Sequence, residues 1–298
     1  MPAPIITSLF NICPMDQNIK FLIHSASSKL KTICSNSYTL DIQILLGHAL
    51  DKDRSFVICN PEFIPNPKQA QKFNNFVERR KKQEPVSHIL GYREFYSREF
   101  FVSTDVLDPR ADTETLIDIV KNIFPYDSKF DFLDIGAGSG NIFTTILAEF
   151  ADSQCFASDI SENALKIAKN NAKSHKVEKR VHFIKSDLLE KLPKTSIFDL
   201  IISNPPYIPS KNISFLEKEV SMYDPIIALD GGNDGLDFYH KISKDAKKHL
   251  KKDGKLLFEI GFDQKKAISA ILLNNNYQNL KFFKDLANND RAILAELN

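Results

Sequence analysis

The chain has 298 residues, a length that fits two domains, and its 43% hydrophobic and 26% charged residues are ordinary for a folded globular protein. A formal net charge of +1 gives no overall reason to expect nucleic acid as the main partner. No apolar run approaches the roughly 18 residues of a membrane-spanning helix, and the four cysteines form no C-x-x-C pair, so we expect a cytoplasmic protein with no membrane association and no metal site.

The first part of the chain predicts a small helical domain over residues 1–84. Apolar residues recur at helical spacing over residues 19–30 and 42–50. A third helix is expected after Pro67, a residue that suits a first helical turn. Strand patterns are scarce in this region, so the helices are expected to pack as a bundle.

Glu84-Pro85 marks a boundary, and the pattern changes after it. Tyr, Phe and Val alternate with polar residues around residues 94–102, which predicts a β-hairpin linker over residues 85–112. Strand and helix patterns then alternate over residues 113–298, which indicates an α/β domain with a mainly parallel sheet. The candidate strands are Asp131–Ile135, Gln154–Ser158, Val181–Lys185, Asp199–Ser203 and Lys255–Ile260, followed by a final pair around Leu280–Phe283 and Ala292–Glu296.

A glycine-rich turn joins the first of these strands to a helix. The turn consists of Gly136, Ala137, Gly138, Ser139 and Gly140. Such turns let a ligand approach the backbone, although one of them alone is also compatible with a purely structural role. Two carboxylates favour S-adenosylmethionine as the ligand. Asp134 stands where it would meet the cationic amino acid end, and Asp159, at the end of the next strand, is suited to accept both ribose hydroxyls.

Asn204-Pro205-Pro206-Tyr207 follows the apolar strand that ends at Ser203. The two prolines stiffen the backbone because each fixes φ and lacks an N–H. The carboxamide oxygen of Asn204 and the carbonyl oxygen of Pro205 are suited to accept hydrogen bonds from the two N–H groups of a planar amide or of an aminated base. The Tyr207 ring is expected to pack on that planar group. A tight turn capped by Asn is the structural alternative.

These features all fall at the carboxyl ends of predicted strands, where open α/β sheets bind ligands. The glycine turn, Asp159, Asp187-Leu188 and Asn204 occupy four such ends. We therefore expect one site that holds S-adenosylmethionine against the Asn204–Tyr207 turn, with Asn204 touching both the donor and the acceptor.

Longer stretches carry a family resemblance. The distinctive ones are Pro85–Phe95, which reads PVSHILGYREF, and Val106–Glu114, which reads VLDPRADTE; Ala228–Leu236, Phe258–Gly261 with Gln264, and Lys284–Leu286 with Asp290-Arg291 are further ones. The chain resembles the HemK/PrmC family of class I methyltransferases, which modify the glutamine of the Gly-Gly-Gln motif in peptide-chain release factors. Asp108 and Ala111 depart from the family pattern, which has an aliphatic residue and a proline there.

The resemblance implies a Rossmann-like seven-stranded sheet, an N-terminal helical bundle that recognises the substrate, and a hairpin linker. It also implies S-adenosylmethionine as cofactor, S-adenosylhomocysteine as product, and release factors as protein substrates in translation termination. Asp187 and Leu188 would flank the adenine of the cofactor. Arg110 is expected either to contact the substrate protein or to form a structural salt bridge. We expect a monomer.

Three other functions fit the same residues. An adenine-N6 methyltransferase acting on DNA or RNA would also present a planar amine to the Asn204 turn, and salt-dependent nucleic-acid affinity would favour it. A glutamine methyltransferase for a ribosomal protein is a related alternative. A non-enzymatic module that only binds S-adenosylmethionine is the third, and the intact Asn204–Tyr207 sequence argues against it.

Overall fold

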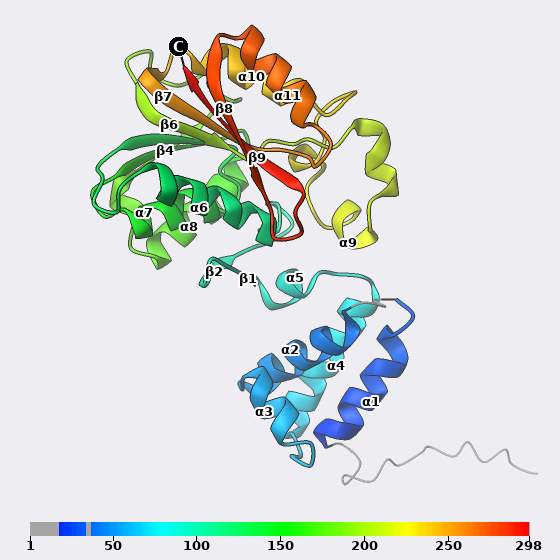
Figure 1. Ribbon diagram of the computed structural model, residues 1–298. Helices are drawn as coiled ribbons and strands as arrows, with labels where there is room; N and C mark the ends of the chain where they lie inside the picture. The colour runs from blue at the N-terminus through cyan, green and yellow to red at the C-terminus, as the bar shows by residue number, and fades with distance from the viewer. Residues whose placement is uncertain (1–17, 34–36, 298) are drawn as a thin grey trace, which may run out of the picture. The chain divides into compact units, whose positions relative to one another are not determined.

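The structure is a computed structural model that describes residues 18–33 and 37–297. The chain divides into two compact units, the first ending at Leu90 and the second beginning at Gly91 (Figure 1). Cys13 and Cys34 lie outside the described residues. Within those residues, no helix combines the length and the hydropathy that crossing a membrane requires.

The first unit is helical, as the apolar spacing predicts. Its helices are α1 (Ile19–Leu30), α2 (Tyr38–Leu50), α3 (Arg54–Cys59), α4 (Pro67–Lys81) and α5 (Val86–Leu90). Leu22, Leu45 and Phe73 contribute to one buried apolar core. The three predicted helices are therefore confirmed, and α3 and α5 are short additions that helical spacing alone did not indicate.

Local side-chain chemistry fixes where two of these helices begin. The Asn18 side chain accepts a hydrogen bond from the backbone N–H of Phe21 at the start of α1. At the start of α4, Asn66 and Gln69 form a reciprocal capping box, and Pro67 occupies the first helical turn. Each cap pairs backbone N–H groups that the helix itself leaves without acceptors.

The second unit combines a hairpin with a larger α/β domain. Its elements in chain order are β1 (Tyr92–Phe95), β2 (Arg98–Phe101), η2 (Ala111–Thr113), α6 (Glu114–Ile123), β3 (Asp131–Ile135), α7 (Asn141–Glu149), β4 (Gln154–Asp159), α8 (Glu162–Ser174), η3 (Glu178–Arg180), β5 (Val181–Lys185), β6 (Phe198–Ser203), η4 (Ser210–Phe215), α9 (Lys218–Ser221), η5 (Ile226–Ala228), α10 (Asp237–Ala246), β7 (Leu250–Glu259), α11 (Lys265–Asn274), β8 (Tyr277–Lys284) and β9 (Asp290–Leu297).

The sheet of this unit has the order β5-β4-β3-β6-β7-β9-β8 within the described residues. The pairs β4–β5, β3–β4, β3–β6 and β6–β7 are parallel, whereas β9 runs antiparallel to both β7 and β8. The predicted α/β class and the mainly parallel sheet are confirmed. Strand order reverses between β3 and β6, and ligands of open α/β sheets bind at such a point.

Helices cover both faces of this sheet (Figure 1). On one face, α6, α7 and α8 pack through residues such as Leu116, Phe143 and Ala168. On the other, α10 and α11 pack through Tyr239 and Ile268. The central strands are apolar on both sides because both of their faces are buried. The polar residues at the carboxyl ends of these strands are therefore the ones available for chemistry.

Candidate active site

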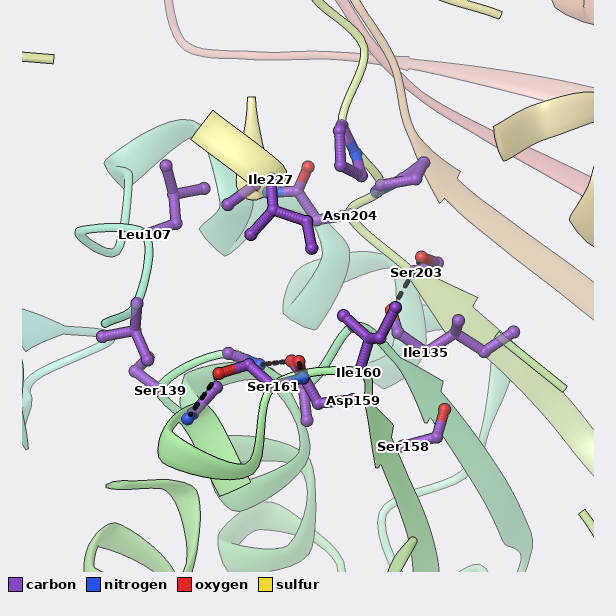
Figure 2. Close-up of a pocket in the computed structure, with 18 of the residues that line it drawn as sticks. Leu107, Ile135, Ser139, Ser158, Asp159, Ile160, Ser161, Ser203, Asn204 and Ile227 are labelled. Atoms are coloured by element: carbon purple, nitrogen blue, oxygen red, sulfur yellow. Dashed lines mark hydrogen bonds between the residues drawn. The ribbon is translucent and has the colours of Figure 1, made fainter. Parts of the chain in front are cut away.

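A cavity opens at the carboxyl ends of β3, β4 and β6, where the strand order reverses. Most of the residues singled out from the sequence line it: Arg110, Gly136, Ala137, Gly138, Ser139, Asp159, Asp187, Leu188, Asn204, Pro205 and Pro206. Figure 2 shows Asn204 and Ile227 across this cavity from Asp159. We call this space the donor cavity. The fold thus brings together side chains that lie far apart in the sequence.

A second cavity meets the donor cavity at the Asn204 turn. The two share Leu107, Arg110, Asn204, Pro205 and Ala228, while Tyr207 and Glu259 line only the second. We call the second space the acceptor cavity. A group bound in one cavity would therefore face a group bound in the other across the carboxamide of Asn204.

Asp159 is held firmly against the glycine turn. The backbone N–H of Gly138 donates to its Oδ2 at 2.9 Å, and the N–H of Ser161 donates to its Oδ1 at 2.8 Å (Figure 2). Burial raises the pKa of Asp159, and these backbone N–H groups oppose that rise. Ser161 also caps α8, because its side chain accepts a hydrogen bond from the backbone N–H of Ala164. The carboxylate is thus oriented before any ligand arrives.

Asp134 and Gly140 are the two predicted cofactor residues that do not line either cavity among the described residues. Asp134 is fully buried in β3, and this burial raises the pKa of its carboxyl to about 7, although the backbone N–H of Phe143 opposes the rise. Gly140 is the N-cap of α7 with φ of 81°. Both residues support the turn from behind the cavity lining.

Arg110 forms the structural pair that was one of its two expected roles. Its Nη2 lies 2.5 Å from Oδ2 of Asp224, a carboxylate that is nearly inaccessible to solvent. The backbone N–H of Asp108 donates to the other oxygen of Asp224 at 3.2 Å. The side chain of Asp108, which departs from the family pattern, lies 3.8 Å from the guanidinium of Arg93. Arg110 also lines both cavities, so its expected substrate contact stays a prediction.

The Asn204–Tyr207 turn is fixed from two sides. The Asn204 Nδ2 donates to the hydroxyl of Thr113 at 3.3 Å. Gln264 Nε2 donates to the backbone carbonyl of Tyr207 at 3.0 Å. Just before the turn, the Ser203 hydroxyl donates to the carbonyl of Ile135, which ties β6 to β3 (Figure 2). The turn is therefore rigid for reasons beyond its two prolines.

Sequence patterns alone did not identify several lining residues. Thr113 and Glu259 come from η2 and from the end of β7, and Ile160, about half exposed, offers an apolar surface next to Asp159. An apolar side chain after the strand-end carboxylate is a signal that would have pointed to Ile160. The described residues contain no cluster of three or more His, Cys, Asp or Glu side chains able to hold a metal ion.

Comparison with known proteins identifies the family of this chain. Residues 22–91 match the PrmC N-terminal domain and residues 95–220 match the methyltransferase small domain. The release factor glutamine methyltransferase of Clostridium acetobutylicum is 38% identical over 278 residues, which cover 93% of this chain and 98% of that protein. The chain belongs to the release factor glutamine methyltransferase family. The methyl donor of this family is S-adenosylmethionine.

Other family relatives are longer. The bifunctional methyltransferase of Rickettsia felis is 36% identical over 307 residues, but these span 94% of this chain and only 58% of that protein.

Solved structures agree at the level of the fold. A methyltransferase from Pyrococcus furiosus matches with a TM-score of 0.51 at 17% identity, covering 67% of this chain and 89% of that one. The hMettl16 catalytic domain, solved in complex with MAT2A 3'UTR hairpin 6, matches with a TM-score of 0.56 at 15% identity, covering 67% and 75%. The architecture is that of a class I methyltransferase.

Proposed function

We propose that the chain transfers a methyl group from S-adenosylmethionine to the side-chain amide nitrogen of the glutamine in the Gly-Gly-Gln motif of peptide-chain release factors. The observation that carries this proposal is the meeting of the two cavities at Asn204 and Pro205. Relatives that match nearly end to end are named release factor glutamine methyltransferases. The reaction would modulate translation termination, and we place it in the cytoplasm.

The residues present in the donor cavity fit S-adenosylmethionine. When bound, this cofactor supplies an electrophilic methyl group on a sulfonium sulfur. The glycine turn admits a ligand close to the backbone, and the pre-oriented Asp159 carboxylate is suited to the ribose hydroxyls. Asp187 and Leu188 are assigned to the adenine. The fully buried Asp134, whose pKa is near neutral, is assigned an indirect role toward the amino acid end.

The Asn204 turn is assigned to the acceptor. An amide nitrogen is a poor nucleophile because its lone pair is delocalised into the carbonyl. Asn204 Oδ1 and the Pro205 carbonyl oxygen would accept hydrogen bonds from the two N–H groups of the amide. These hydrogen bonds would orient the nitrogen toward the donor cavity and stabilise the positive charge that builds up on it. Tyr207 would pack on the planar amide, and Pro206 keeps these groups in place.

A protein acceptor is also supported by the surface beside the acceptor cavity. The segment 210–228 supplies Leu216, Val220 and Ala228 to the cavity lining. The same segment exposes Phe215, Met222 and Ile226, which are 85%, 64% and 60% accessible. Several exposed apolar side chains on one segment suit a contact with another protein. We propose that this surface, Arg110 and the helical domain of residues 1–84 contact the release factor, and that the chain acts as a monomer.

A methyl-transfer assay that offers release factors, ribosomal proteins and nucleic acid side by side tests this function. We expect mass spectrometry to find the added methyl on the Gly-Gly-Gln glutamine. Asn204→Ala should reduce turnover by about 100-fold or more, because two oriented acceptors are reduced to one, while the affinity for S-adenosylmethionine changes little. Label found only in adenine would instead identify a nucleic-acid methyltransferase, and binding of the donor without transfer to any acceptor would identify a non-enzymatic module.

A further inference from the structure

A line of buried polar groups stands behind Asn204. Its Nδ2 donates to the Thr113 hydroxyl at 3.3 Å, and Thr113 is only 2% exposed. The Thr113 hydroxyl is also close enough to the Glu259 carboxyl to lower the pKa of that carboxyl. Glu259 is 1% exposed at the end of β7, next to Phe258, which is in register with Ser203. Sheet register therefore places Glu259 level with Asn204 on the neighbouring strand.

The Glu259 carboxyl is incompletely paired. Its Oε2 is buried and has no hydrogen-bond partner among the described residues. Thr113 and Tyr207 are the two side-chain donors close enough to lower its pKa, and the Arg291 guanidinium lowers it further by charge. Arg291 itself contacts the carboxylates of Asp285 and Asp112 at 3.0 and 3.2 Å. A buried carboxyl oxygen without a partner is energetically costly, and Thr113 is one of the two hydroxyl-bearing residues that lower the pKa of this carboxyl.

The direction of these hydrogen bonds determines which way Asn204 faces. A carboxylate only accepts, so a Thr113 hydroxyl that turns toward Glu259 must donate its single proton to that carboxylate. The Thr113 oxygen then has only lone pairs for Asn204, which must present its NH2 group to Thr113. The carboxamide oxygen of Asn204 is left for a ligand. The reverse orientation would set two acceptors, Asn204 Oδ1 and Thr113 Oγ1, against each other.

We propose that Thr113 and Glu259 are positioning residues which, through this directed pair of hydrogen bonds, hold the Asn204 carboxamide with its oxygen toward the acceptor nitrogen. The proposal rests on the proposed function, because it assumes that Asn204 accepts an N–H of the acceptor. It adds that the ionised carboxylate of Glu259 sets the orientation of Asn204 through Thr113.

Protonation of Glu259 would weaken the orientation of the Asn204 carboxamide. A neutral carboxyl donates as well as accepts, so Thr113 becomes free to donate to Asn204 and both carboxamide orientations are populated. Burial, with the nearby Asp112 charge, raises the pKa of Glu259 to about 7, while Thr113, Arg291 and Tyr207 oppose the rise. The Tyr239 phenol donates to the backbone carbonyl of Glu259 rather than to its carboxyl. Turnover should therefore rise with pH through the neutral range.

Three substitutions test the hydrogen-bond chain. Thr113→Val keeps the shape and removes the hydroxyl, and should lower kcat by about 10- to 100-fold with little change in the Kd for S-adenosylmethionine. Thr113→Ser restores the hydroxyl and should recover kcat to within about threefold of the native value. Thr145→Val is the matched control, because Thr145 in α7 is equally buried, lines neither cavity, and its hydroxyl has no hydrogen-bond partner in the described part of the chain. Its kcat should be unchanged.

Glu259→Gln tests the role of charge, because a carboxamide in that place does not titrate. The rise of kcat/KM across neutral pH should disappear in this variant. If Thr113→Val turns over at the native rate, or if Glu259→Gln keeps the same pH profile, the proposal is wrong. If Glu259 had only a structural role, Glu259→Gln would lower the stability of the fold but would leave the pH dependence of kcat/KM in place.

A readout without turnover separates this proposal from the proposed function. The side-chain amide signals of Asn204 in an ¹⁵N NMR spectrum, assigned by their loss in Asn204→Asp, report the hydrogen bond to Thr113 directly. They should titrate near neutral pH in the native chain bound to S-adenosylhomocysteine, and stop titrating in Glu259→Gln. Signals that do not titrate in the native chain would overturn the proposal. Failure to methylate a release factor would instead overturn the proposed function alone.

Discussion

Gln264 Nε2 donates a hydrogen bond of 3.0 Å to the backbone carbonyl of Tyr207. The same nitrogen donates to the carbonyl of Gly235 at 3.2 Å, and the Gln264 Oε1 accepts from the N–H of Gly261 at 3.0 Å. All three partners are backbone groups, so the amide orientation of Gln264 is determined. One buried side chain thus joins the end of the Asn204–Tyr207 turn to the loop after β7 and to the glycine-rich segment before α10.

Replacing Gln264 by Met tests this connection. Methionine fills a similar volume but pairs none of the three backbone groups, so the free energy of unfolding should fall by about 1–3 kcal/mol. The turn should also lose its fixed position, and kcat should fall about tenfold or more while the affinity for S-adenosylmethionine is largely retained. Chemical denaturation and calorimetric titration measure the two effects. An unchanged kcat would show that the prolines alone hold the turn.

Gly235→Ala is expected to disturb the same turn by steric contact. Gly235 has φ of 80°, and a Cβ there would lie 2.3 Å from the Tyr207 carbonyl oxygen. The strained backbone and the overlap together should cost more than about 2 kcal/mol of stability.

Gly136→Ala is the matched control, because its φ is 76° but a Cβ would meet nothing within 4 Å. The strain alone should cost about 1–2 kcal/mol there. Thermal unfolding of both variants, without ligand, checks the difference. Equal losses would mean that the contact with Tyr207 is relieved by movement of the loop.

Asp159→Asn should weaken the binding of the methyl donor and of its product to the same extent. The carboxylate is assigned to the ribose hydroxyls, which S-adenosylmethionine and S-adenosylhomocysteine share, and a charged acceptor binds hydroxyls more strongly than a neutral one. We expect the Kd of each ligand to rise about 10- to 100-fold by calorimetry. A loss confined to S-adenosylmethionine would show that Asp159 instead recognises the sulfonium charge.

The buried Asp134 should make stability depend on pH. Its pKa is raised from 3.8 to about 7 in the folded chain, chiefly by burial. Between these values the folded state binds more protons than the unfolded state, so the free energy of unfolding falls as pH rises through that window, by up to about 1.4 kcal/mol per pH unit. Asp134→Asn should reduce this slope when urea denaturation is followed at pH 5 and pH 7.5 without ligand. An unchanged slope would mean that Asp134 is ionised in the fold throughout.

The sequence predicted the strands and the residues that follow them because a buried parallel strand is a continuous apolar run with a polar end. Asp159 and Asn204 were identified in this way, and both line the donor cavity. Both residues line the cavity because of the sheet topology, since the carboxyl ends of parallel strands meet at one edge of the sheet. Asp134 was also singled out from the sequence, but its side chain is buried and does not line the cavity. Whether a strand residue faces the cavity depends on the direction of its side chain, and the spacing of Asp134 from the glycines does not determine that direction.

Thr113 and Glu259 were not identified as site residues because no spacing rule links them to Asn204. They approach it through the start of α6 and through the β6–β7 register, which are features of the folded sheet. The pairing of Arg110 with Asp224 has the same origin, since the two residues are 114 positions apart. Such contacts form only in the tertiary structure, and the sequence indicated only the motifs around these residues.

A crystal structure of the chain with S-adenosylhomocysteine and a release factor tests the central claim most directly. The distances to measure join Asn204 Oδ1 and the Pro205 carbonyl oxygen to the nitrogen of the Gly-Gly-Gln glutamine amide, and that nitrogen to the thioether sulfur. We predict that both oxygens lie within hydrogen-bonding distance of the nitrogen and that the sulfur stands on its opposite side, in the donor cavity. A sulfur located away from the Asn204 turn, or a glutamine bound elsewhere, would contradict the account.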